Sequence, residues 1–322
     1  MSTFETLIKR GGNEAIKLNP PTGADFHITS RGSDWFWTCF CCYLLFGLIL
    51  TFLMFRKPVN DRFFYYTGIA PNFFMCVAYF TMASNLGWIA VKAKYNHVQT
   101  STQKEHPGYR QIFYARYVGW FLAMPWPIIQ VCLLGHTPVW QIAFNVCITE
   151  FFTVCWLIAG CVHSTYKWGY YTIGLGAAIV VCISLMTTTY NLVKQKDNSI
   201  RIIFLTIVSI IGFMWIIAYP TCFGLTDGGN VLQPDSAGIF FGIIDLIVMC
   251  FVPTLFVPIA SNFGAERLGY HFGESDSEPM SSFSPRPIAT PKPAATPKLA
   301  EKKDKKKSKK SKKSKKSKKS EE

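Results

Sequence analysis

Seven long apolar segments alternate with shorter polar links along this chain. Each segment is close to the roughly 20 residues that cross a bilayer as a helix, and none has the alternating polarity of a membrane barrel strand. The predicted spans are residues 35–55, 63–91, 112–134, 139–162, 169–188, 202–225 and 238–261. The pattern therefore predicts an all-α integral membrane protein, a seven-transmembrane-helix bundle. This bundle occupies residues 35–261, between an N-terminal segment (1–34) and a C-terminal tail (262–322).

Composition supports a membrane protein and places the basic charge in the tail. Half of the 322 residues are hydrophobic and 16% are charged, against about 25% in an average soluble protein. Of the 33 Lys and Arg residues, 17 follow Asn262. The positive net charge therefore belongs mostly to one terminal segment, and it does not indicate a nucleic-acid-binding fold.

The tail combines a Ser- and Pro-rich part with Lys-Lys-Ser repeats from Lys306 to Ser320, a composition typical of disorder. Basic residues in the links do not decide the orientation, but a Lys-rich tail fits the cytosolic side. We therefore expect the N-terminus out and the C-terminus in, at the plasma membrane. The lysines either solvate the tail or bind anionic inner-leaflet lipid, at roughly 1 kcal/mol each. Three Ser/Thr-Pro sites are candidate phosphorylation sites: Ser284, Thr290 and Thr296. Phosphorylation of the serines within the Lys-Lys-Ser repeats would cancel the charge that binds lipid.

The eleven cysteines all lie within apolar segments. No Cys-x-x-Cys pair lies near a histidine in the spacing of a zinc site, so we expect no zinc. We interpret the cysteines as small buried hydrophobic residues. Cys39, Cys41 and Cys42 lie near a membrane boundary, which leaves palmitoylation open for them.

Three charged side chains interrupt the apolar segments, namely Arg116, Glu150 and Asp245. A charge at this depth is costly, so it normally faces the bundle interior and has a partner. Arg116 and Asp245 are expected at similar depth in the third and seventh helices, and we predict a buried ion pair between them. Glu150 has no obvious mate; it is either protonated or bonded to Thr153 or a neighbouring helix. No proton path follows, because the third helix continues with Gly119 and Gln130, neither of which titrates.

The segments also resemble known sequences. Residues 115–125 resemble the third helix of the microbial rhodopsins, residues 215–236 their sixth helix and its exit loop, and residues 244–249 their retinal-attachment motif. The resemblance covers about residues 30–265. Residues 10–15 and the Lys-rich tail look closer still to the yeast opsin-related membrane proteins linked to heat shock and other stresses.

By this resemblance, Arg116 and Asp245 correspond to the conserved arginine and the counter-ion carboxylate. The resemblance also implies a vestigial retinal pocket, formed by Tyr117, Trp120, Tyr219, Pro220 and Met249.

The departures from the family pattern remove its photochemistry. Met249 stands where a lysine would form the Schiff base, and a thioether cannot condense with an aldehyde, so we expect no cofactor and no covalent retinal. Gly119 and Gln130 occupy the proton-acceptor and proton-donor positions. Trp215 is displaced by one residue from the usual Trp-x-x-Tyr-Pro spacing, and Phe223 replaces a second pocket tryptophan.

The resemblance therefore implies a non-photochemical, opsin-like membrane protein with a stress-related, chaperone-like or regulatory role, and no enzymatic activity. The alternative is a light-independent ion or proton transporter using the Arg116/Asp245 interior. A G-protein-coupled receptor is disfavoured, because Arg116 lies at the start of its helix and the seventh segment lacks Asn-Pro-x-x-Tyr. A hydrophobic ligand held non-covalently in the former pocket is a weaker alternative. Expected partners are membrane lipids, a membrane protein or a second copy, and no nucleic acid.

Overall fold

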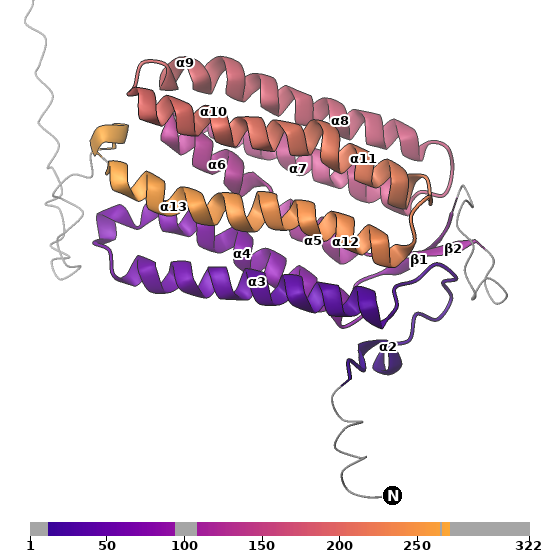
Figure 1. Ribbon diagram of the computed structural model, residues 1–322. Coiled ribbons are helices and arrows are strands. Elements are labelled where there is room, and N and C mark those ends of the chain that lie inside the picture. The colour runs from indigo at the N-terminus through magenta and orange to yellow at the C-terminus, as the bar shows by residue number, and fades with distance from the viewer. Residues whose placement is uncertain (1–11, 94–107, 265, 271–322) are drawn as a thin grey trace, which may run out of the picture. The chain divides into compact units, whose positions relative to one another are not determined.

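The computed structural model describes residues 12–93, 108–264 and 266–270, all within one unit that ends at Gly273. The tail repeats and the three candidate phosphorylation sites lie outside the described residues. The described part is a bundle of helices with a small hairpin at one end (Figure 1). We call this the hairpin end and the opposite one the far end.

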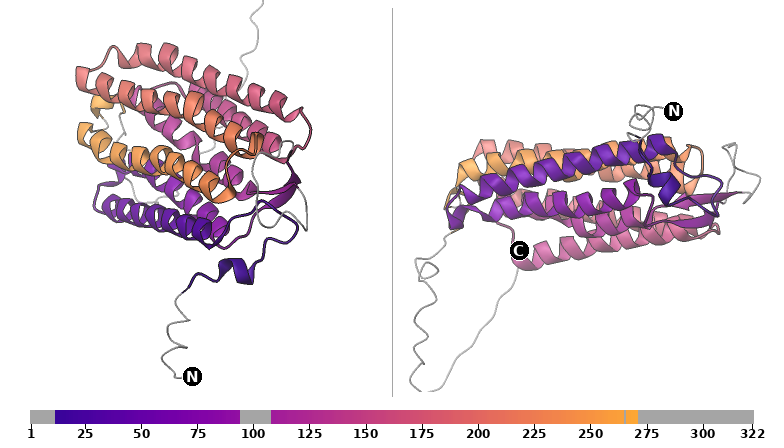
Figure 2. Two further views of the ribbon diagram at one scale, coloured as in Figure 1. Left: turned by 45° about the vertical axis from the view of Figure 1, so that its right-hand side comes forward. Right: turned by 90° about the horizontal axis from the view of Figure 1, so that it is seen from below.

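Seven helical rods form the bundle. Their segments in chain order are α3 (Ser30–Phe55), α4 (Phe63–Ala83), α5 (Tyr114–Ala123) with α6 (Pro125–Leu134), α7 (Val139–Cys161), α8 (Lys167–Ser184) with α9 (Tyr190–Val193), α10 (Asn198–Phe213) with α11 (Tyr219–Phe223), and α12 (Pro234–Asp245) with α13 (Val252–Phe263). Rods adjacent in the chain pack on one another, and α12 packs back on α3, which closes the ring. Figure 2 shows the rods side by side from two further directions.

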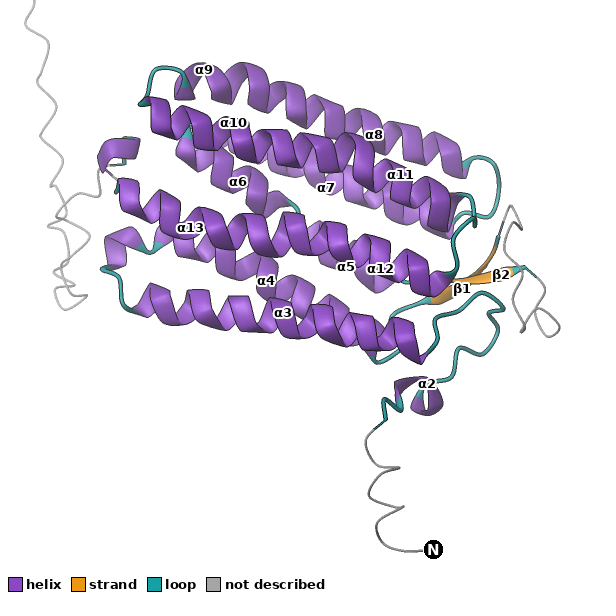
Figure 3. Ribbon diagram, in the orientation of Figure 1, coloured by secondary structure: helices purple, strands orange, loops and turns teal. Residues whose placement is uncertain are grey.

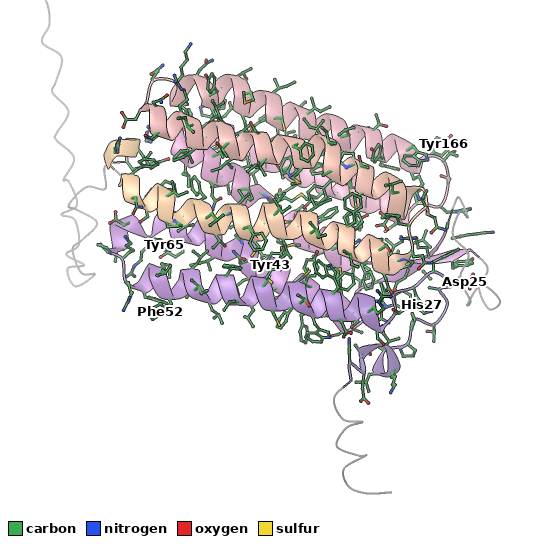
Figure 4. The ribbon with its side chains drawn as sticks, viewed as in Figure 1. Asp25, His27, Tyr43, Phe52, Tyr65 and Tyr166 are labelled. Atoms are coloured by element: carbon green, nitrogen blue, oxygen red, sulfur yellow. The ribbon has the colours of Figure 1, made fainter. Side chains whose placement is uncertain are left out.

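Six rods are long and apolar enough to cross a membrane. The remaining one, α4, has 21 residues and packs between α3 and α5, with the amide of Asn72 buried inside. The outward surfaces carry large apolar side chains, as expected of helices that face lipid. On α3, for example, Phe52 points outward and is 61% exposed, while Tyr43 lies inside the bundle and is fully buried (Figure 4).

The prediction that the second span continues to Val91 is wrong. The helix ends at Ala83, after which Asn85 and Gly87 adopt positive φ values of 55° and 69° that turn the chain. Strand β1 (Ile89–Lys92) then pairs antiparallel with β2 (Tyr109–Ile112), with Ile89 opposite Ile112 (Figure 3). Ile89 and Val91 belong to a strand outside the bundle, although their hydrophobicity extends the helical pattern.

Wide π-helical turns interrupt three rods, at Leu185–Thr189, Met214–Ala218 with Gly224–Gly228, and Leu246–Phe251. The turn at Met214–Ala218 explains the displaced Trp215. One extra residue in a regular helix would rotate everything beyond it by about 100°, whereas a π-turn absorbs the residue and keeps the flanking faces aligned. Trp215 is accordingly fully buried, with its ring 5.5 Å from that of Phe152.

Residues after the last helix fold back over the far end. The hydroxyl of Tyr270 donates to the backbone carbonyl of Leu133 at 2.8 Å, and Lys196 Nζ donates to the carbonyl of Leu268 at 2.7 Å. These contacts, with the buried side chain of Leu268, close the far end of the core.

Candidate functional site

Asp245 is the centre of the bundle interior and is bound by three neutral donors. Its Oδ1 accepts hydrogen bonds from the hydroxyl of Tyr219 at 2.7 Å and from Trp120 Nε1 at 2.9 Å. Its Oδ2 accepts from the hydroxyl of Tyr79 at 2.7 Å. All four side chains are fully buried. One carboxylate therefore joins the second, third, sixth and seventh rods.

Aromatic packing holds the three donors in place. The ring of Tyr79 stacks on Tyr43 at 5.4 Å and meets Phe36 edge-on at 5.8 Å. The rings of Trp120 and Tyr219 meet edge-on at 5.0 Å. Because these rings have fixed neighbours, their hydroxyl and indole groups are oriented before any ligand arrives.

The predicted ion pair between Arg116 and Asp245 is corrected by the structure, which pairs Arg116 with Asp227 instead. Arg116 Nη1 lies 3.8 Å from Asp227 Oδ2, and its guanidinium lies over the ring of Phe241 at 4.2 Å. Phe241 is one turn before Asp245, and Arg116 is one turn before Trp120. The arginine is therefore about one turn nearer the hairpin end than the carboxylate that the sequence assigned to it.

Asp227 organises a second polar group, which we call the hairpin-end cluster: Arg110, Arg116, Tyr117, Lys167 and Asp227. Tyr117 donates its hydroxyl to Asp227 Oδ2 at 2.7 Å, and Arg110 Nε lies 3.8 Å from Oδ1. Lys167 Nζ donates to the backbone carbonyl of Asp227 at 2.8 Å. Sequence reasoning missed this cluster, because Arg110, Lys167 and Asp227 all lie outside the predicted spans, in the links between them.

Arg110, the charged residue of strand β2, is buried among other charged groups. Arg110 is 2% exposed and donates to Asn230 Oδ1 and, at 2.9 Å, to the carbonyl of Leu232. Burial lowers the pKa of the Arg110 guanidinium; Asp227 acts in the opposite direction, and the like charge of Arg116 lowers it further. The hairpin-end cluster contains three buried cations, Arg110, Arg116 and Lys167, and the carboxylate of Asp227.

The residues predicted to form a retinal pocket divide between these two centres. Trp120 and Tyr219 face Asp245, whereas Tyr117 faces Asp227. The carbonyl of Pro220 accepts a hydrogen bond from Tyr171 at 3.3 Å. Met249 is fully buried in the π-turn that follows Asp245.

The proton-acceptor and proton-donor positions of the family pattern, Gly119 and Gln130, take no part in either centre. Glu150 takes no part in either centre. The buried side chain of Gln130 is 3.5 Å from the carbonyl of Pro253, and Gly119 packs against α4. Glu150 is partly exposed, and Thr153 donates to its backbone carbonyl at 2.8 Å.

Gly119 is required by close packing. A Cβ atom there would lie 2.7 Å from the Cβ of Ala78 and 3.1 Å from the Sδ of Met75. We expect Gly119→Ala to lower the free energy of unfolding by about 1–3 kcal/mol, as overpacking does. A thiol-reactive dye that labels the buried cysteines on heating measures the change. Gly176→Ala is the control: its Cβ meets nothing within 4 Å, so it should raise stability by about 0.5 kcal/mol. Equal effects of the two substitutions would contradict the packing argument.

The interior does not fit covalently bound retinal. Met249 offers a thioether where an amine is needed. Among the described residues, Lys167 is the buried lysine, and its ammonium is engaged at the hairpin end with Asp227. Asp245, the counter-ion of the family pattern, has both oxygens bound by neutral donors. Within the same residues, no group of three His, Cys, Asp or Glu side chains could hold a metal.

Comparisons with known proteins agree with this architecture. Residues 32–251 match the family model described as bacteriorhodopsin-like protein. Protein MRH1 of Saccharomyces cerevisiae is 84% identical over 295 residues, covering 90% of this chain and 92% of that protein. The 30 kDa heat shock protein of the same yeast is 37% identical over 280 residues, covering 81% and 82%.

Solved structures show the same fold. The light-driven proton pump LR (Mac) from Leptosphaeria maculans aligns with a TM-score of 0.67 and 24% identity, covering 73% of this chain and 98% of that one. The seven rods, their closed ring and the matched sequence lead to one assignment. The chain belongs to the family of bacteriorhodopsin-like proteins.

Proposed function

We propose that this protein is a non-photochemical member of its family, with a stress-related regulatory role at the plasma membrane. The 30 kDa heat shock protein, 37% identical to this chain, supports the stress-related part through its name. The non-photochemical part rests on the two residues that would carry the chemistry, Asp245 and Met249.

The observation that carries the proposal is Met249, which stands one turn after Asp245 where the family pattern has the retinal-attachment lysine. Without that lysine no Schiff-base cation forms beside Asp245, and its two oxygens accept hydrogen bonds from Tyr79, Trp120 and Tyr219. The carboxylate thus links four rods. Its role in this protein is structural, since it fixes the relative positions of α4, α5, α11 and α12.

Proton transport is not favoured by the interior. The buried charged side chains of the described residues are those at the hairpin end and Asp245 itself. Beyond Asp245, toward the far end, the buried polar groups include the amides of Asn72 and Gln130. Side-chain amides do not ionise near neutral pH, and a proton relay needs a series of groups that do.

The first test is reconstitution with all-trans retinal. We expect no absorption band above about 450 nm, because Met249 cannot form a Schiff base. The purified full-length protein is mixed with retinal in detergent and its visible spectrum recorded. The Leptosphaeria maculans pump, prepared without retinal in the same way, is the positive control. A stable red-shifted band in this protein would overturn the proposal.

The regulatory part requires a partner, and we propose a membrane protein or anionic inner-leaflet lipid that the Lys-rich tail engages. The test is crosslinking and pull-down from native membranes, with full-length protein and with a variant ending at Tyr270. A partner lost with the tail supports this part. A proton-flux measurement in liposomes tests the alternative that the protein is a transporter. A light-independent proton current would support the transporter and overturn the regulatory proposal.

A further inference from the structure

The hairpin-end cluster contains more buried positive charge than negative. Arg110, Arg116 and Lys167 are each 3% exposed or less, and Asp227 is the carboxylate among them. The other buried carboxylate described at this end, Asp25, accepts a hydrogen bond from the backbone amide of Gly108 at 2.8 Å. Buried charges are normally paired, so three cations around one carboxylate leave a demand for negative charge.

The distances within the cluster leave this demand unmet. Arg110 and Arg116 each lie 3.8 Å from an oxygen of Asp227, which is too far for a direct hydrogen bond. The Nε atoms of both arginines are buried and have no hydrogen-bond partner. Buried N–H groups without an acceptor are uncommon, and each has a cause such as an ordered water or an ion.

A small cavity lies beside one of these two arginines, Arg110. Arg110, Lys167, Asp227 and Asn230 line it, together with Lys92 of strand β1, whose side chain is exposed to solvent. The cavity volume is about 10 Å³, counted as the region that the centre of a water-sized sphere can occupy. A cavity of this volume holds a single water molecule or an ion of similar size. Two buried cations of the lining, Arg110 and Lys167, offer N–H donors, and the Lys167 ammonium donates to the backbone carbonyl of Asp227.

From this arrangement we propose that the cavity beside Arg110 and Lys167 binds a small monovalent anion of the halide class, chloride in an aqueous salt solution. The anion accepts hydrogen bonds from the cluster and lowers its net charge. A water molecule satisfies the donors but leaves the charge in place. Phosphate, sulfate and carboxylates are too large for a cavity of this volume. Exchange with the solution proceeds past Lys92 at the hairpin end.

The test replaces chloride by gluconate at constant sodium and ionic strength, and follows the thermal unfolding of the purified full-length protein. Chloride should raise the midpoint along a saturable curve, by roughly 5 °C at a large excess over Kd, with bromide substituting for it. Broadening of the ³⁵Cl NMR line, reversed by bromide, measures the same site without unfolding. If chloride and gluconate give equal midpoints and the ³⁵Cl line is unchanged, the cavity holds water only and the proposal fails.

A variant locates the site. Lys167→Gln removes one cation of the cavity and should lose most of the chloride-dependent rise, measured against the variant's own unfolding midpoint in gluconate. Lys194→Gln removes the same charge from an exposed position at the far end and should keep the full rise. An unchanged chloride effect in Lys167→Gln would overturn the assignment. If that variant does not fold, the ³⁵Cl measurement on the wild type still decides whether a halide binds.

Discussion

Replacing Asp227 by Asn is expected to lower the thermal unfolding midpoint of the full-length protein by roughly 10 °C, which corresponds to about 3–5 kcal/mol. The substitution keeps the shape of the side chain and removes the negative charge that faces Arg110 and Arg116. Two buried guanidinium groups and the ammonium of Lys167 then remain without a carboxylate. Removing one partner of a buried charge pair is costly because the other partner stays desolvated.

The matched control is Asp197→Asn at the far end. Asp197 also pairs with an arginine, Arg267, but both side chains are about half exposed. Surface pairs of this kind contribute less than about 1 kcal/mol. A thiol-reactive dye reports unfolding in all variants through the buried cysteines. If the two substitutions lowered the midpoint equally, Asp227 would not be the neutralising group of the hairpin end.

Hydropathy alone predicted the seven rods, because the bilayer imposes both their length and their apolar composition. It failed at Val91, where a short strand outside the bundle is as hydrophobic as a helix end. It also could not place Trp215, since a π-turn is a property of backbone packing and leaves no periodic signal over five residues. The end of the second span was predicted wrongly, whereas the displacement of Trp215 was noted but had no explanation until the backbone geometry was known.

The sequence predicted that Arg116 and Asp245 belong to the buried site, but it did not predict their partners. Arg116 and Asp245 are buried as expected, yet a difference of one helical turn in depth gives each a different partner. Counting residues from a predicted helix start cannot resolve one turn. Tyr79 and Asp227 were missed for another reason. A tyrosine counts as apolar in a hydrophobic segment, and an aspartate followed by two glycines indicates a turn.

Replacing Asp245 by Ala is expected to cost about 4 kcal/mol, whereas replacing it by Asn should cost only about 1 kcal/mol. Alanine leaves the donors of Tyr79, Trp120 and Tyr219 buried without an acceptor. The amide of asparagine keeps an oxygen for Trp120 and Tyr219, and its nitrogen can donate to the hydroxyl of Tyr79 once that hydroxyl rotates. The contrast between the variants separates hydrogen-bond acceptance from charge, because both remove the carboxylate.

The pairing predicted from the sequence requires the opposite result. If Asp245 were held by the charge of Arg116, its loss would leave that arginine unpaired, and Asn would be as damaging as Ala. Thermal unfolding of both variants, beside the wild type, measures the difference. Tyr79→Phe extends the comparison, since it keeps the ring stacked on Tyr43 and removes one donor. A small loss in Tyr79→Phe and Asp245→Asn, with a large loss in Asp245→Ala, means that the former counter-ion now serves as a hydrogen-bond acceptor that holds four helices together.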